Sequence, residues 1–241
     1  MLKEGSTVNI DEIDAVLREG RLSDERVRRE LAKRLRSTGE EGKFLVILPK
    51  FSDEERSAQE KAGRLIIRPS TGEATLQELQ ASGASNLGYV NQSEKLRGLR
   101  SVVTEFAIDP RNLVIHGSNR LLRHERIAKV REFDDQVRGD FGDTVAAVTP
   151  YAVDWAQMDL EYMEAHDNKP LIADSNPNGA LFIGTIDDLV GGSDPVDVGR
   201  YDPAYRLGVN TWAAADRSPA LWAPAVVVPA MRLENREIES L

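Results

Sequence analysis

Short unbroken apolar runs alternate with amphipathic stretches along the chain, and this alternation predicts a mixture of strands and helices. Residues 44–48 read FLVIL before a proline, and residues 65–67 read LII before an Arg-Pro step. Apolar runs of this length are typical of buried strands. Between them, Ser52 and Glu55 form a capping-box pattern that predicts a polar helix over residues 52–61. The order strand, helix, strand predicts a small βαβ unit.

The second half of the chain predicts two longer helices and a further strand. Apolar side chains recur at helical spacing over residues 119–137. Thr149 followed by Pro150 is a favourable helix start, because threonine caps well and proline suits the first helical position. Residues 181–186 read LFIGTI and predict a strand with an internal glycine.

Proline and glycine shape the expectations for the last third of the chain. Residues 191–203 are rich in Gly, Asp and Pro and predict a long loop. Residues 220–233 form the last apolar region, but Pro224 and Pro229 interrupt it. Proline cannot donate to a sheet ladder, so these breaks predict an edge strand or a transition from a loop to an edge strand.

The first 42 residues predict a separate helical unit. Gly20 ends one predicted helix and Ser23 caps the next, whose narrow apolar seam is flanked by arginines. We therefore expect residues 1–42 to form a helical arm or hairpin and residues 43–241 to form a mixed α/β domain. A Ser-, Gly-, Gln- and Asn-rich stretch near residues 80–97 predicts a flexible segment. The predicted fold class is α+β: a helical N-terminal segment followed by a mixed sheet with packed helices.

Composition narrows the classes of function. The chain has 241 residues, a formal net charge of −9 and no cysteine. Disulfides and cysteine nucleophiles are thereby excluded, and the acidic balance argues against specific nucleic-acid binding. The sequence opens on MLKEGSTVNIDEID, which has no apolar signal-peptide core. The apolar run near the C-terminus falls short of the about 20 residues that span a membrane. We expect a cytoplasmic or virion protein that makes no membrane contact.

No catalytic, metal-binding or cofactor-binding constellation stands out. His116 and Ser118 follow a predicted strand, but the G-x-S-x-G pattern is absent. Asp187 and Asp188 are adjacent acids without the spacing of a calcium loop. No dinucleotide or phosphate-loop fingerprint occurs, so we expect no cofactor. A hydrolase or metal-dependent enzyme using His116 and Ser118, or Asp187 and Asp188, stays open as an alternative.

Contact surfaces are the other class of candidate. The second N-terminal helix carries a basic face that would suit an adaptor module or an inter-subunit contact. Large aromatic side chains in the C-terminal part are favoured anchors of interfaces. The interface candidates are Arg28, Arg29, Lys33, Trp155, Tyr205, Trp212 and Trp222.

One stretch resembles a known family. Residues 149–186 combine a predicted helix with a Trp-Ala step at 155–156, a Lys-Pro-Leu step at 169–171, an Asn/Pro/Gly loop at 176–179 and the strand at 181–186. This order is similar to a segment of tailed-phage major capsid proteins and of encapsulin shells. The resemblance implies a structural self-assembling protein, a virion or shell component. Its partners would be copies of itself, in a homo-oligomer, and other virion proteins.

Overall fold

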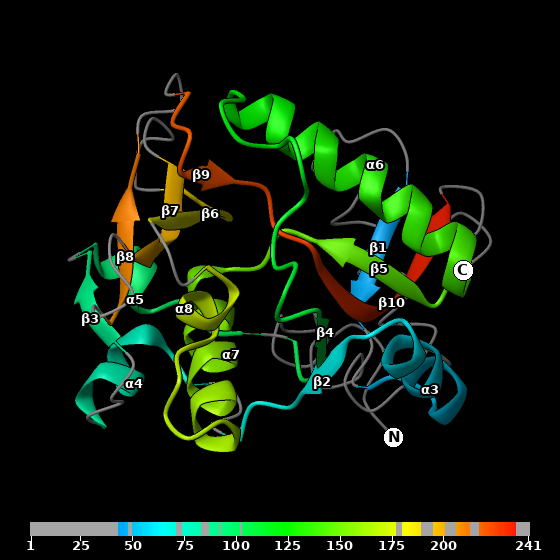
Figure 1. Ribbon diagram of the computed structural model, residues 1–241, viewed down its shortest axis with the longest axis horizontal. Helices are drawn as coiled ribbons and strands as arrows, with labels where there is room; N and C mark the ends of the chain where they lie inside the picture. The colour runs from blue at the N-terminus through cyan, green and yellow to red at the C-terminus, as the bar shows by residue number, and fades with distance from the viewer. Residues whose placement is uncertain are drawn as a thin grey trace, which may run out of the picture.

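Two five-stranded sheets lie side by side, and the helix α7 (Ala152–Ala165) lies between them (Figure 1). The computed structural model describes residues 43–47, 50–70, 74–82, 87–91, 93–101, 103–176, 180–188, 195–200, 206–212 and 217–234. The predicted α+β class is confirmed by this combination of helices and sheets. The predicted arm of residues 1–42 lies outside the described residues.

Sheet 1 is antiparallel and is built around one long strand. Its order is β1 (Lys43–Ile47), β10 (Val226–Glu234), β4 (Phe106–Ile108) and β2 (Leu65–Ile67), with β5 (Val145–Val148) also paired to β10. Sheet 2 is mixed, because β3 runs parallel to β8 and β6 runs parallel to β9. Its order is β3 (Leu87–Val90), β8 (Leu207–Thr211), β7 (Pro195–Arg200), β6 (Leu181–Asp188) and β9 (Leu221–Trp222).

Both faces of sheet 1 are buried, which explains its nearly continuous apolar strands. Because side chains alternate between faces, Ala107, Val145 and Val227 pack with Val137 of α6 (Arg123–Phe141). Their chain neighbours face the other way, into the main core around α7: Phe106, Ile108, Ala146, Val226 and Val228. Sheet 1 is therefore the middle layer between α6 and α7.

The βαβ prediction at the start of the domain is wrong, although each of its elements exists. β1, α3 (Asp53–Lys61) and β2 all form, and Ser52 and Glu55 make the predicted capping box. However, β10 and β4 lie between β1 and β2, and every neighbouring pair in this path is antiparallel. β1 and β2 therefore run in opposite directions, and α3 is not a parallel crossover.

The prediction of a C-terminal edge strand is also wrong, because β10 lies at the centre of sheet 1. In an antiparallel pair, alternate residues of a strand direct their N–H groups toward the same partner strand. Ala230 N donates to Thr144 O, next to β5, so the adjacent Pro229 directs its nitrogen away from β5. Along the edge of β10 opposite β5, the strand pairs with β4 as far as Val227 and with β1 from Ala230 onward. Pro229 falls at this change, where its missing N–H interrupts neither ladder.

Three shorter helices complete the described structure. They are α4 (Leu76–Ala81), α5 (Glu94–Arg97) and α8 (Leu171–Ser175). The segment around 80–97 that was predicted to be flexible contains β3 and α5. None of the described helices combines the length and the apolar character that crossing a lipid bilayer would require.

Candidate functional site

One face of sheet 2 is built largely from glycine. Gly184 of β6 pairs with Asp197 of β7, and Gly199 pairs with both Phe182 and Gly208. Paired residues share a face of a sheet, and so do residues two apart on one strand. These five residues therefore lie on the same side of sheet 2, which we call the glycine face.

Phe182 occupies the space that glycine leaves open. A Cβ atom on Gly199 would overlap the carbonyl oxygen of Leu181 and would lie 2.7 Å from both Cα and Cδ1 of Phe182, so no other side chain fits at this position. Phe182 is fully buried, and its ring centroid lies 5.3 Å from that of Trp212. The glycine at position 199 thus lets an aromatic pair pack directly on the backbone of sheet 2.

The first turns of α6 approach the same face. The Nε atom of Arg126 lies 3.8 Å from the point that a Cβ atom on Gly184 would occupy. The Arg126 side chain is buried, and its Nη1 donates a hydrogen bond of 2.5 Å to the carbonyl of Leu121. A Cβ atom at position 184 would therefore be in ordinary van der Waals contact with Arg126. α6 therefore places a buried cation against sheet 2.

Asp197 is the buried acid opposite this cation. It is 1% exposed, and neither of its carboxylate oxygens accepts a hydrogen bond. Burial raises the pKa of Asp197 to about 7, and the charge of Arg126 acts in the opposite direction but less strongly. Buried carboxylates normally have hydrogen-bond partners, because leaving one without them costs free energy. A buried acid with so strongly shifted a pKa is a candidate for function.

A cavity of about 30 Å³ lies beside Asp197, where α6 meets sheet 2. Ile127 and Val130 of α6 line it on one side, and Trp212 and Trp222 line it from sheet 2. We call this space the junction cavity. A void of this size exceeds the about 10–15 Å³ that a single water needs, so it can hold a few atoms.

The structure brings two of the predicted interface aromatics together at this cavity and buries a third elsewhere. Trp212 and Trp222 are partly exposed and line the junction cavity. Trp155 is 0% exposed in the main core, so its ring presents no surface to a neighbouring molecule. The remaining candidates lie outside the described residues: Arg28, Arg29, Lys33 and Tyr205.

The structure does not assemble a nucleophile and a base from His116 and Ser118. Ser118 is fully buried, and its Oγ accepts a hydrogen bond of 2.8 Å from the amide of Ala223. This hydroxyl joins two segments of backbone and is closed to a substrate. His116 is exposed and lines an open hollow of about 440 Å³ beside α6, together with Lys129 and Glu132. Lys129 and Glu132 pair with each other at 2.6 Å.

The acidic pair at the end of β6 offers no metal site that can be described. Asp187 and Asp188 belong to β6, but their side chains lie outside the described residues. Within the described part of the chain, no group of three or more His, Asp or Glu side chains is arranged to hold a metal ion.

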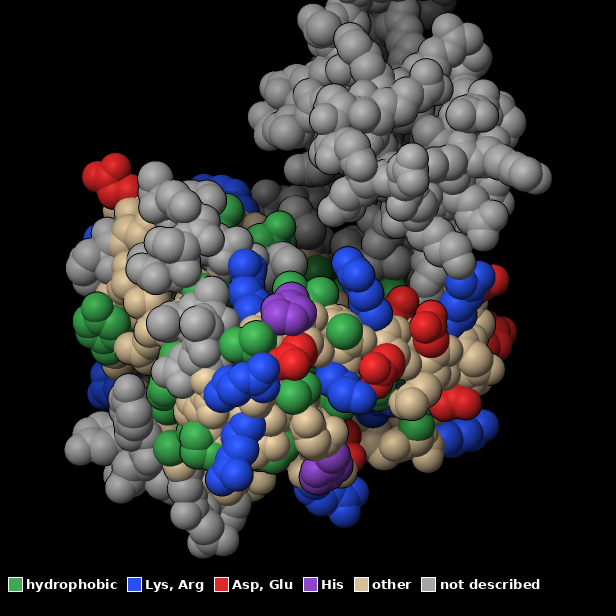
Figure 2. Space-filling view, turned by 90° about the horizontal axis from the view of Figure 1, so that it is seen from above, with side chains coloured by type: hydrophobic (Ala, Val, Ile, Leu, Met, Phe, Trp, Pro, Cys, Tyr) green, Lys and Arg blue, Asp and Glu red, His purple; other side chains and the backbone are tan. Residues whose placement is uncertain are grey.

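The face that carries α6 is charged but mixed in sign. Figure 2 shows Lys and Arg side chains interspersed with Asp and Glu over the described part of this face. A duplex-binding surface would instead gather basic side chains into one stripe. This face therefore has the character of a solvated surface.

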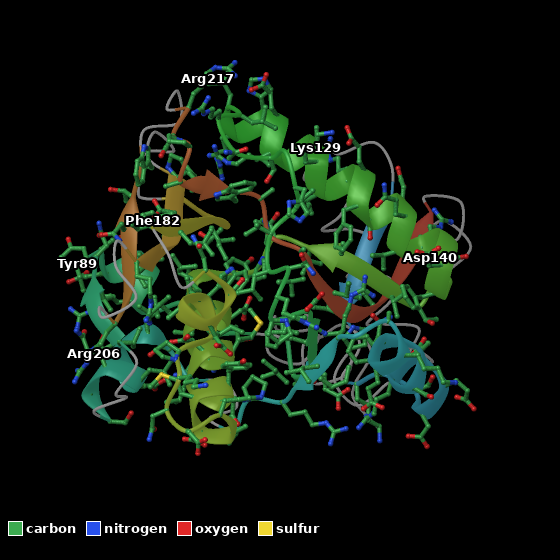
Figure 3. The ribbon with its side chains drawn as sticks, in the orientation of Figure 1. Tyr89, Lys129, Asp140, Phe182, Arg206 and Arg217 are labelled. Carbon is green, nitrogen blue, oxygen red and sulfur yellow. The ribbon has the colours of Figure 1, made fainter. Side chains whose placement is uncertain are left out.

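Exposed apolar side chains mark the edges of both sheets. Among the described residues, the large hydrophobic side chains that stand exposed are Tyr89, at 58%, and Leu65, at 38%. Tyr89 belongs to β3, the terminal strand of sheet 2, and Leu65 belongs to β2, the terminal strand of sheet 1. Figure 3 shows Tyr89 on the outer side of the molecule, with Arg206 on the same side toward the other end of β3. Both edges thus combine a terminal strand with an exposed apolar group.

Fold and site together define an α+β protein with two sheets, a buried acid where α6 meets sheet 2, and an exposed apolar side chain on a terminal strand of each sheet. No protein-family model, curated protein or solved structure matches the chain.

Proposed function

We propose that the protein is a self-assembling structural protein that acts through contacts between its own copies. The observation that carries this proposal is the position of Tyr89 and Leu65. Among the described residues they are the exposed large hydrophobic side chains, and each lies on the terminal strand of a different sheet. A protein that works as a single molecule usually protects its sheet edges with charge, proline or a covering segment. The LGYV sequence of β3 contains neither charge nor proline, whereas Arg64, Arg68 and Pro69 flank β2.

Strand addition at these edges would supply the first contacts. Backbone groups of an edge strand can pair with a strand of a second copy, and the exposed side chain then becomes buried. Burying the exposed part of Tyr89 or Leu65 contributes about 1–2 kcal/mol, which is roughly tenfold in the dissociation constant. A stable interface covers about 1,200–2,000 Å² in total, so the contact must extend beyond the strands themselves.

A virion or shell component is the particular form of assembly that we propose. Its support is the resemblance of residues 149–186 to a segment of phage capsid and encapsulin proteins. In the structure this segment forms α7, α8 and most of β6, and α7 is buried between the two sheets. The resemblance thus lies in the framework of the subunit, and the sheet edges would provide the contacts with other copies or other virion proteins.

The mass of the purified full-length chain in solution tests the proposal. Size-exclusion chromatography with light scattering should give a multiple of the 26.7 kDa chain mass that grows with protein concentration. Tyr89→Lys should shift this distribution toward the monomer, because an ammonium group cannot be buried at the strand contact. Ala128→Lys, on the exposed outer side of α6, adds the same charge away from either edge and should leave the distribution unchanged.

A wild-type chain that stays at 26.7 kDa at millimolar concentration would overturn the proposal. So would equal effects of the two lysine substitutions, because the loss would then reflect charge alone. Circular dichroism of each variant establishes that the monomer is folded.

A further inference from the structure

The junction cavity has the features of a binding site that self-assembly does not use. Its polar group is the Asp197 carboxylate, which is 1% exposed and accepts no hydrogen bond at either oxygen. Its apolar walls include Ile127, Trp212 and Trp222. A carboxylate that faces a cavity without a donor needs one from whatever fills that cavity.

Charge selects the kind of molecule that could supply this donor. Arg126 and the partly exposed Arg123 line the cavity together with Asp197, so charges of both signs surround it when the acid is ionised. A cation would be repelled by Arg126, and an anion would be repelled by Asp197. A neutral group that donates a hydrogen bond fits this balance.

We propose that the junction cavity binds a small neutral molecule, of the primary-amide class, that donates an N–H hydrogen bond to Asp197 and packs its carbon atoms against Trp212 and Trp222. The volume of about 30 Å³ limits the bound part to a few heavy atoms. Acetamide is the simplest probe of this class. So small a ligand binds with a dissociation constant on the order of 1 mM or weaker.

Acetone is the matched probe without a donor, because it has nearly the same shape as acetamide and no N–H group. The chain has three tryptophans, so the indole N–H signals in a nitrogen–proton NMR spectrum give three reporters. At pH 8, above the pKa of about 7 of Asp197, acetamide titrated to about 100 mM should shift the signals of Trp212 and Trp222. The shifts should saturate with a dissociation constant on the order of 1 mM or weaker. Trp155, buried in the main core away from the lining of this cavity, serves as the internal control.

Acetone should bind at least tenfold more weakly than acetamide, and Asp197→Asn should weaken acetamide binding by a similar factor. Asp135→Asn, on the exposed side of α6, removes a carboxylate elsewhere and should leave the titration unchanged. Equal binding of acetone and acetamide would overturn the proposal, as would binding that survives Asp197→Asn. Shifts that are absent or do not saturate would overturn it as well. So would tighter binding of isopropylammonium, a small cation, than of acetamide.

Discussion

Gly199 controls the packing of the glycine face because its neighbour Phe182 fills the place of a side chain. A Cβ atom there would lie 2.7 Å from Phe182 Cα, and backbone cannot move aside as a flexible side chain can. We therefore expect Gly199→Ala to lower the free energy of unfolding by about 3 kcal/mol, at the upper end for overpacked cores. Urea unfolding followed by circular dichroism measures this loss.

Gly139 provides the control for that substitution. It lies inside α6, and a Cβ atom on it would meet nothing within 4 Å. Gly139→Ala should stabilise the protein by about 0.5–1 kcal/mol, because alanine restricts the unfolded chain and favours the helix. Equal effects of the two alanines would contradict the packing described for Phe182.

Asp197 makes stability depend on pH in a predictable direction. Its pKa is about 7 in the folded protein and near 3.8 in the unfolded chain. Between these values the folded protein holds the proton more tightly, so this group lowers stability as pH rises from about 4 to about 7. Asp197→Asn cannot ionise and should be more stable than the wild type by about 2–4 kcal/mol at pH 8, with little difference at pH 4.

The charged and polar groups around Asp197 do not reverse this fall in stability with rising pH. Arg126 and Arg123 of α6 line the same cavity, Thr185 of β6 lies beside it, and Asn210 of β8 is the cross-strand partner of Asp197. The attraction of Arg126 lowers the pKa of Asp197 but is the smaller cause. The difference in urea midpoints between the two proteins at pH 4, 6 and 8 isolates Asp197 from other titrating groups. A difference that does not grow with pH would refute the assigned pKa shift.

Local side-chain patterns were predictable at the residue scale, whereas burial was not. Ser52 and Glu55 form the predicted capping box because both partners lie within one helical turn. Asp197 lies in a Val-Asp-Val alternation that could have indicated a strand, but nothing in it shows that both faces are covered. Its environment depends on Gly184 and Arg126, which are distant in the sequence.

Glu105, a buried carboxylate just before β4, joins α3 and β2 to that strand. It accepts a hydrogen bond of 2.9 Å from the amide of Phe51, just before α3. It also pairs with Arg56 of α3 at 3.3 Å and with Arg68, just after β2, at 2.6 Å. Glu105 itself precedes β4 and is 4% exposed. This carboxylate therefore fixes α3 against the edge of sheet 1.

Glu105→Gln should lower the free energy of unfolding by about 2 kcal/mol. The amide has one acceptor oxygen, so either the Phe51 amide or the arginine pair must face an N–H donor. The estimate is modest because the Arg68 side chain is 54% exposed and water screens its charge. Thermal and urea unfolding measure the change. Glu132→Gln, which breaks the exposed pair with Lys129, should cost less than about 0.5 kcal/mol.

Elements with apolar runs were predictable, but their partners were not. β1, β2 and β6 formed where FLVIL, LII and LFIGTI indicated them. β7 and β8 were missed because Pro, Asp, Gly and Asn in their sequences are typical of loops. Gly199, in the stretch predicted to be a loop, is the glycine that lets Phe182 pack closely on β7. Strand order is set by contacts between distant segments, so the central place of β10 could not be inferred from its prolines.

At the scale of the whole molecule, the two ends of the described chain meet in sheet 1. β1 pairs with β10 over five positions, from Lys43 with Glu234 to Ile47 with Ala230. All of sheet 2 lies between them in the chain, so sheet 1 is completed only when the last strand is in place (Figure 1). The fold class was predictable from composition and pattern. The division into two sheets was not, because it depends on this long-range closure.

The two apolar edges also determine how copies can meet. Arg206 lies beside β3, with its Cβ 3.2 Å from where a Cβ on Gly88 would stand. α3 packs beside β2 and has three exposed acidic side chains, Asp53, Glu54 and Glu60, and one exposed lysine, Lys61. The charge near β2 is mixed, because Arg64 and Arg68 flank the strand. We propose that the acids of α3 attract Arg206 of another copy, so that the β3 edge of one copy pairs with the β2 edge of another. Such head-to-tail contacts can extend to rings or larger shells.

Mixing two single variants distinguishes head-to-tail pairing from pairing of like edges. Tyr89→Lys blocks the β3 edge and Leu65→Lys blocks the β2 edge, so each variant alone should be monomeric. Each still carries the edge that the other lacks, and an equimolar mixture should therefore form dimers that grow no further. Pairing of like edges would instead give dimers in each variant alone and no new species on mixing. Light scattering of the two variants and of their mixture separates these outcomes, because the contact between unlike edges exists only in the mixture.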